Sequence, residues 1–267
     1  MTIQPTLLFS ALFALLTASI YIYVGWRLSK RVISSADARL AWGSFTVWWY
    51  GLAAITLIGA FQSLLGAVGF TSLPLFVTAT YINFLILCLA LCGLVYYLIY
   101  LFTGNSRSLM ILVVFYLIYY ILLVYYITAS VPSDVKVERW STEIVFNSQL
   151  TGPFFVIMLV LLLLPQILGG LAYFTLYFRV SDATQKYRIL LVSWSIIIWF
   201  LSPLLGLVGG LAQHDWWQFV TRFIGLAAAL TILMAYLPPL WLKQRYGILS
   251  LSDENQHTKG IHKNVYG

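Results

Sequence analysis

Seven long apolar runs constrain this chain more than any other feature of its sequence. Each holds about 20 or more predominantly apolar residues, the length that a helix needs to cross the hydrocarbon core of a bilayer. They are too long, and alternate too little, for the strands of a membrane barrel. We therefore predict an all-α polytopic membrane protein with seven transmembrane helices, at Thr6–Trp26, Ala41–Val68, Leu73–Phe102, Leu109–Thr128, Pro153–Phe178, Ile189–Leu211 and Trp217–Leu242.

Composition supports the same class. The chain has 267 residues, of which 61% are hydrophobic and only 9% are charged, whereas an average soluble domain has about 25% charged residues. So few charges cannot cover a water-exposed surface of this size, which excludes a soluble globular enzyme and a disordered chain. The basic residues lie between the apolar runs and form no patch, so we expect no nucleic-acid partner.

The distribution of Lys and Arg predicts the orientation. Two basic residues, Lys136 and Arg139, lie on one side of the predicted spans, and Arg222 lies within the last span. By the positive-inside rule the other side, which holds twelve, faces the cytoplasm of a cell whose plasma membrane the protein spans. The N-terminus is then outside, residues 1–249 form the bundle, and residues 250–267 form a short polar cytoplasmic tail. The twelve are Arg27, Lys30, Arg31, Arg39, Arg107, Arg179, Lys186, Arg188, Lys243, Arg245, Lys259 and Lys263.

Polar side chains at depth are costly in lipid, so they are the candidate site residues. Arg222 is the ionisable residue well inside a span, and Gln62, Tyr81, Asn83 and Gln166 lie at mid-depth or in the outer half. We predict that these five line one cavity open to the outside, suited to a carboxylate or a lipid phosphate. Two alternatives stay open: Arg222 reaching the outer headgroups, and the amides joining helices by hydrogen bonds.

The sixth span carries a candidate hinge. Trp199 precedes Pro203 by one helical turn, and a proline inside a helix removes one backbone hydrogen bond and favours a kink. Proline is also commoner in membrane helices than in soluble ones, so a purely structural role is the alternative.

The residues that haem, metal, proton-relay and hydrolase sites require are missing from the predicted spans. The histidines His214, His257 and His262 lie outside the spans, and Asp and Glu do not occupy mid-membrane positions. A haem, a metal site and a carboxylate proton relay are therefore not expected. The chain also lacks the Gly-rich phosphate loop and the common hydrolase motifs, so we predict that it is not an enzyme and has no cofactor.

One resemblance is to the microbial rhodopsins. Trp199-x-x-x-Pro203 resembles the Trp-x-x-x-Pro stretch of their sixth helix, and Tyr81-Ile-Asn83-Phe84 resembles the Tyr-x-Asp-aromatic stretch of their third. The retinal-binding lysine in the middle of the seventh helix has no match, because Lys243 lies at the cytoplasmic exit. The resemblance implies the architecture without a covalent retinal; a non-covalent lipid or carotenoid stays open.

A second resemblance is to the seven-helix N-terminal sensor region of bacterial histidine kinases and cyclases. It rests on four short segments: Asp37-Ala-Arg-Leu-Ala-Trp42, Gly152-Pro-Phe-Phe, Gln185-Lys-Tyr-Arg188 and Pro238-Pro-Leu-Trp-Leu-Lys243. It implies a non-catalytic, receptor-like sensor module that signals through its cytoplasmic face, with membrane lipids and a protein as partners. The alternatives are an accessory subunit of a membrane complex that binds lipid or pigment, and a small-molecule carrier.

Overall fold

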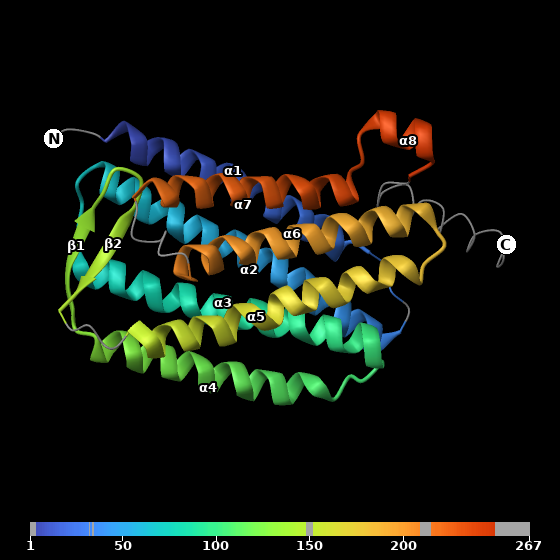
Figure 1. Cartoon of the computed structure of the whole chain (residues 1–267), viewed down its shortest axis with the longest axis horizontal. Coiled ribbons are helices and arrows are strands. Elements are labelled where there is room, and N and C mark those ends of the chain that lie inside the picture. The colour runs from blue at the N-terminus through green and yellow to red at the C-terminus, as the bar shows by residue number, and fades with distance from the viewer. Residues whose placement is uncertain (1–3, 32, 34, 148–151, 209–214, 249–267) are drawn as a thin grey trace.

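The fold is a bundle of long helices with a small hairpin at one end (Figure 1). The computed structural model describes residues 4–31, 33, 35–147, 152–208 and 215–248, and for 152–162, 165, 206–208, 215 and 246 it describes the backbone alone. Its elements are α1 (Pro5–Ser29), α2 (Ala36–Ala67), α3 (Leu73–Thr103), α4 (Ser108–Ala129), β1 (Pro132–Val137), β2 (Thr142–Phe146), α5 (Gly152–Thr175), the 3-10 turn η1 (Leu176–Phe178), α6 (Ala183–Val208), α7 (Asp215–Tyr236) and α8 (Leu240–Tyr246).

Six described helices are long and apolar enough to cross a membrane: α1, α2, α3, α4, α6 and α7. The shortest of their apolar stretches has 21 residues, which at about 1.5 Å per residue spans about 30 Å. The chain is therefore a multi-pass membrane protein. Helix α5 has 24 residues and lies in the same bundle (Figure 1), and its described apolar part is Gln166–Phe178.

Consecutive helices pack side by side from α1 to α4 and from α5 to α7, and α7 closes the bundle against α1. Helix α3 also contacts α5, while α4 packs on α3 at the edge. The approach of α2 and α3 depends on small residues, since a Cβ added to Gly93 would lie 2.6 Å from the carbonyl oxygen of Ser44. Small residues allow such close packing where lipid supplies no hydrophobic force between helices.

The centre of the bundle is aromatic. Trp48 and Trp49 of α2 are fully buried, and the Trp48 ring stacks on Phe200 of α6 with centroids 5.6 Å apart. Phe45 stacks on Tyr97 of α3 at 4.4 Å. These ring contacts connect α2 to α6 and to α3, so they fix the middle of α6 relative to α2.

The loop between α4 and α5 contains the two-stranded antiparallel hairpin β1–β2, so the prediction of an all-α chain was incomplete. Strand β1 alternates polar and β-branched residues from Asp134 to Val137, and β2 is rich in β-branched residues; both patterns favour strands. Lys136 pairs with Glu143 in the register and forms an ion pair with Glu138 at 2.6 Å. Trp140 packs on Phe219 of α7, with centroids 4.6 Å apart. The hairpin thus borders one end of the bundle.

The predicted final span, Trp217–Leu242, is wrong at its C-terminal end. Helix α7 ends at Tyr236, and α8 begins after Pro238 and Pro239. Proline has no N–H to donate and disfavours a helical conformation in the residue before it, so two in succession end the helix. By contrast, α6 continues through Pro203. Figure 1 shows α8 projecting from the end of α7, and its Leu240 is 74% exposed.

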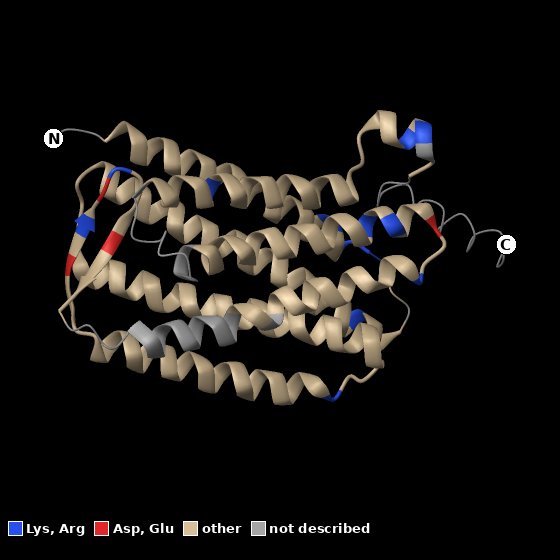
Figure 2. Cartoon of the chain, in the orientation of Figure 1, with Lys and Arg blue, Asp and Glu red and all other residues tan. Residues whose placement is uncertain are grey.

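Basic residues gather at the end of the bundle opposite the hairpin (Figure 2). Ten of the twelve residues predicted to share one side lie in described segments at this end, among them Arg31 at the end of α1 and Arg188 in the first turns of α6. The other two, Lys259 and Lys263, lie in the tail, outside the described residues. We call the hairpin end the outer end and the basic end the inner end.

Candidate functional site

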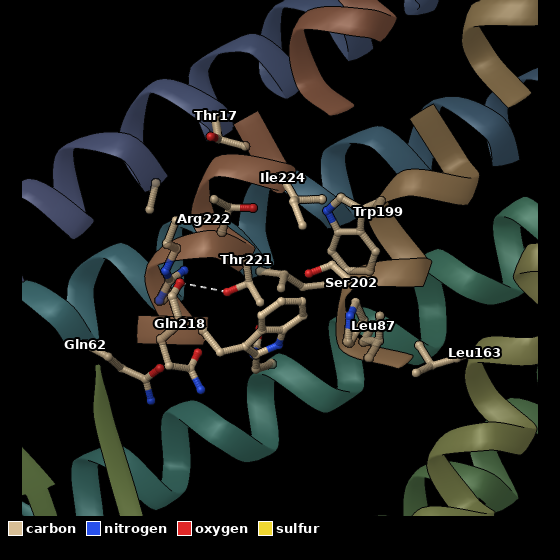
Figure 3. Close-up of a pocket in the computed structure, with 18 residues that line it drawn as sticks. Thr17, Gln62, Leu87, Leu163, Trp199, Ser202, Gln218, Thr221, Arg222 and Ile224 are labelled. Carbon is tan, nitrogen blue, oxygen red and sulfur yellow. Dashed lines mark hydrogen bonds between the residues drawn. The ribbon is translucent and has the colours of Figure 1, made fainter. Parts of the chain in front are cut away.

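A cavity of about 520 Å³ lies among the helices in the outer part of the bundle (Figure 3). Six helices contribute to its wall, so it is a feature of the bundle and not of one helix–helix contact. Its lining residues are Ala14, Thr17, Ile55, Thr56, Gly59, Gln62, Asn83, Leu87, Leu163, Trp199, Ser202, Pro203, Trp217, Gln218, Thr221, Arg222, Ile224 and Gly225.

Arg222 supplies the charge. It lies seven residues after the start of α7, about 10 Å along the helix axis. Its guanidinium lies over Gly59 of α2, where a Cβ would be 3.1 Å from Nη1, so the glycine leaves the space that the guanidinium occupies. Its Nε is buried, and the guanidinium has no hydrogen-bond or ion-pair partner among the described residues. The positive charge is therefore not neutralised by the described protein groups.

Three carboxamides line the same cavity as this charge. Gln62 lies one turn from Gly59 on α2, and Gln218 lies one turn from Arg222 on α7; Figure 3 shows both on the same side of the cavity as Arg222. Gln218 donates from Nε2 to Oε1 of Glu143 in β2 at 3.2 Å, which connects the cavity wall to the hairpin. Asn83 of α3 also lines the cavity, and its Oδ1 is buried with no described partner.

Helix α6 forms the opposite wall. Trp199, Ser202 and Leu87 of α3 lie across the cavity from Arg222 (Figure 3). Ser202 is only 4% exposed, and its Oγ has no hydrogen-bond partner among the described residues. Pro203 has no N–H, so it cannot donate to the carbonyl of Trp199 four residues earlier. This wall therefore combines apolar surface with the Ser202 hydroxyl, which has no hydrogen-bond partner among the described residues.

The structure brings together three of the five predicted ligand-binding residues, Arg222, Asn83 and Gln62, and adds the predicted hinge pair Trp199 and Pro203. Their role in binding stays a prediction. The lining also includes Gln218, Thr221 and Ser202, which had not been singled out from the sequence. The i, i+4 spacing of Gln218 and Arg222 is the signal that places Gln218 on the same helix face.

Tyr81 and Gln166 do not line the cavity. The Tyr81 hydroxyl hydrogen-bonds with Thr128 Oγ1 of α4 at 2.9 Å. Gln166 of α5 is fully buried and donates from Nε2 to the Tyr116 hydroxyl of α4 at 3.1 Å. Depth alone had grouped them with the others, but Tyr81 and Asn83 are two residues apart and so point about 200° apart on one helix.

Two acidic residues, Glu143 in β2 and Asp215 at the start of α7, lie at the outer end of the bundle. Glu143 accepts hydrogen bonds from Gln218 and, at 3.0 Å, from Ser141 Oγ. The side chain of Asp215 lies outside the described residues. Among the described lining residues the cavity holds one guanidinium, three carboxamides, hydroxyls and apolar surface, and it holds no carboxylate, imidazole or thiol. This donor-rich set suits recognition of an anion with an apolar body.

Comparison with protein families, with curated proteins and with solved structures found no match. The resemblances to rhodopsins and to the sensor regions of histidine kinases therefore stay predictions that rest on short motifs.

Proposed function

We propose that the protein is a non-catalytic membrane sensor whose outer cavity binds an anionic, partly apolar small molecule. The observation that carries this proposal is the Arg222 guanidinium on the wall of a cavity of about 520 Å³: its Nε is buried, and it has no hydrogen-bond or ion-pair partner among the described residues. An unpaired charge at this depth is costly, and a bound carboxylate or phosphate would neutralise it. The planar guanidinium donates to either group in a bidentate manner. The neighbouring Trp199, Leu87 and Trp217 would cover the apolar body of the ligand.

We infer that the bundle has seven spans, with α5 as the seventh, and that its basic inner end faces the cytoplasm of the cell. The charge distribution supports this orientation, because two basic residues, Lys136 and Arg139, lie in the hairpin and ten lie at the inner end. The cavity then faces the outer leaflet or the exterior. A reporter fused to the C-terminus should be active on the cytoplasmic side only, and activity outside would reverse the assignment.

Helix α6 is the proposed route from ligand to partner. It carries Trp199 and Pro203 at the cavity and reaches the inner end at Ala183. Trp199 contacts Trp48 edge-on at 6.1 Å, and Trp48 stacks on Phe200. A ligand that displaces Trp199 would repack this aromatic cluster and tilt α6 about Pro203, where one backbone hydrogen bond is already missing.

Affinity purification in mild detergent, with and without decanoate, tests the sensor role. A sensor should recover a cytoplasmic partner in an amount that changes severalfold with decanoate, measured by mass spectrometry. Recovery of membrane subunits in fixed stoichiometry, whether or not decanoate is present, would favour the accessory-subunit alternative.

An absorption spectrum of the same sample reports a bound pigment. Because the seventh span has no lysine at its middle, we expect no covalent retinal adduct, and a hydroxylamine-sensitive band after retinal addition would contradict this expectation.

A further inference from the structure

A second cavity, of about 360 Å³, lies at the inner end of the bundle. Five long helices, η1 and the segment after α1 contribute to it, and none of its described lining residues is shared with the outer cavity. Two arginines, Arg31 and Arg188, take part in its wall, together with Gln185 and the aromatic residues Trp42, Tyr97, Tyr173 and Tyr236. The outer-ligand proposal does not use this cavity.

The two guanidiniums are held by aromatic rings. The Arg31 guanidinium lies 4.5 Å from the centroid of Trp42, and that of Arg188 lies 5.8 Å from the centroid of Tyr236. These distances are typical of cation–π contacts, and the N–H donors of a guanidinium lie in the plane of the group. Tyr173 lines the same cavity as both arginines.

The burial and charge of the wall distinguish it from an ordinary basic surface. Arg188 is only 8% exposed, although it is an arginine at the end of a helix. No Asp or Glu occurs among the described lining residues. The nearby Asp182 accepts a hydrogen bond at 2.7 Å from the backbone N–H of Gln185, so it caps the start of α6. The cavity is therefore positive, partly aromatic and located at the level of the inner helix ends.

We propose that this inner cavity binds a phosphate group through Arg31 and Arg188. Two guanidinium forks provide more N–H donors than a single carboxylate requires, and they match the several acceptor oxygens of a phosphate. The aromatic and aliphatic walls would contact whatever carries that phosphate. Two sources present this chemistry at the inner end: the headgroup of an anionic phospholipid in the cytoplasmic leaflet, and a soluble phosphate ester.

Native mass spectrometry of the full chain, released from nanodiscs that contain phosphatidylglycerol, tests this proposal. The wild-type protein should retain one phosphatidylglycerol molecule, whereas the double variant Arg31→Gln, Arg188→Gln should reduce retention at least tenfold. Arg107→Gln is the matched control, because Arg107 is an exposed arginine at the inner end of the bundle. It is the residue directly before α4. Since Arg188 is buried, the single variant Arg31→Gln, at an exposed residue, is also measured, and its retention should be intermediate.

Titration with glycerol 3-phosphate distinguishes the two sources. A lipid site should show weak or undetectable binding of glycerol 3-phosphate, while a site for soluble esters should bind it in the wild-type protein and lose it in the double variant. The proposal is overturned if both the lipid and glycerol 3-phosphate bind equally to the wild-type protein, the Arg31→Gln variant and the double variant. Equal losses in the Arg107→Gln control would also overturn it, because the effect would then be general surface charge.

Discussion

Replacing Arg222 with Gln is expected to weaken the binding of decanoate to the purified protein about 30-fold or more. The estimate follows from the cost of about 2–5 kcal/mol that accompanies truncation of one partner in a buried charged pair, at about 1.4 kcal/mol per tenfold change. Gln keeps some hydrogen-bonding capacity and a similar length but has no charge. Arg222→Lys, which keeps the charge and lacks the planar fork, should fall between Arg222→Gln and the wild type. Calorimetric titration in an uncharged detergent measures all three.

The same variant separates a binding role from a structural one. Without ligand, the wild-type protein contains a guanidinium whose Nε is buried and which has no partner among the described residues, so Arg222→Gln should unfold at the same temperature or a higher one. A melting temperature lowered by several degrees would show that Arg222 stabilises the bundle instead. Arg139→Gln, a charge removed from the outer hairpin, is the matched control and should change neither the affinity nor the melting temperature.

Replacing Gly59 with Leu is the second change with a large expected effect. A Cβ on Gly59 would lie 3.1 Å from Nη1 and 3.6 Å from Nη2 of Arg222, so the added side chain would occupy the space beside the guanidinium. The neighbouring atoms are the end of a flexible side chain, so the fold should accommodate the change. We expect decanoate affinity to fall at least tenfold, although the charge of the protein is unchanged.

Gly43→Leu is the control for Gly59→Leu. Both glycines belong to α2, but a Cβ on Gly43 would meet no atom within 4 Å, and the residue is exposed on the bundle surface. Its affinity for decanoate should equal that of the wild type. If Gly59→Leu binds decanoate as well as Gly43→Leu does, the ligand does not occupy the space next to Arg222, and the proposed site is wrong.

Much of the fold was predictable because the thickness of the bilayer sets the length of the apolar runs. The long runs gave helices such as α1 and α3 at nearly their observed positions. The hairpin was missed because the segment between the predicted spans Leu109–Thr128 and Pro153–Phe178 was treated only as a connecting loop, and the alternation in β1 was not considered. Trp217–Leu242 was predicted as one span because its apolar run continues past Pro238 and Pro239, where the structure ends α7 and begins α8.

The sequence predicted how deep the site residues lie in the membrane, but it did not predict which way their side chains point. Asn83 and Tyr81 lie at one depth, but an apolar helix has no polar face that tells which of them points inward. The contribution of Ser202 required the position of α6 relative to α7, which depends on packing between distant parts of the chain. From the sequence, Arg31 and Arg188 were used only to predict the orientation of the protein in the membrane. The sequence does not show that the ends of separate helices, and the two arginines on them, meet in one cavity.

The central claim is that the outer cavity selects its ligand by negative charge, and one calorimetric series on the wild-type protein tests it. Decanoate, decanol and decyltrimethylammonium have the same apolar chain length and differ in the charge of the head. Pairing with the Arg222 guanidinium predicts saturable binding of decanoate at a ratio near one per protein, with at least tenfold weaker binding of decanol and none of the cation. Equal binding of decanoate and decanol, or tighter binding of the cation, would contradict the account.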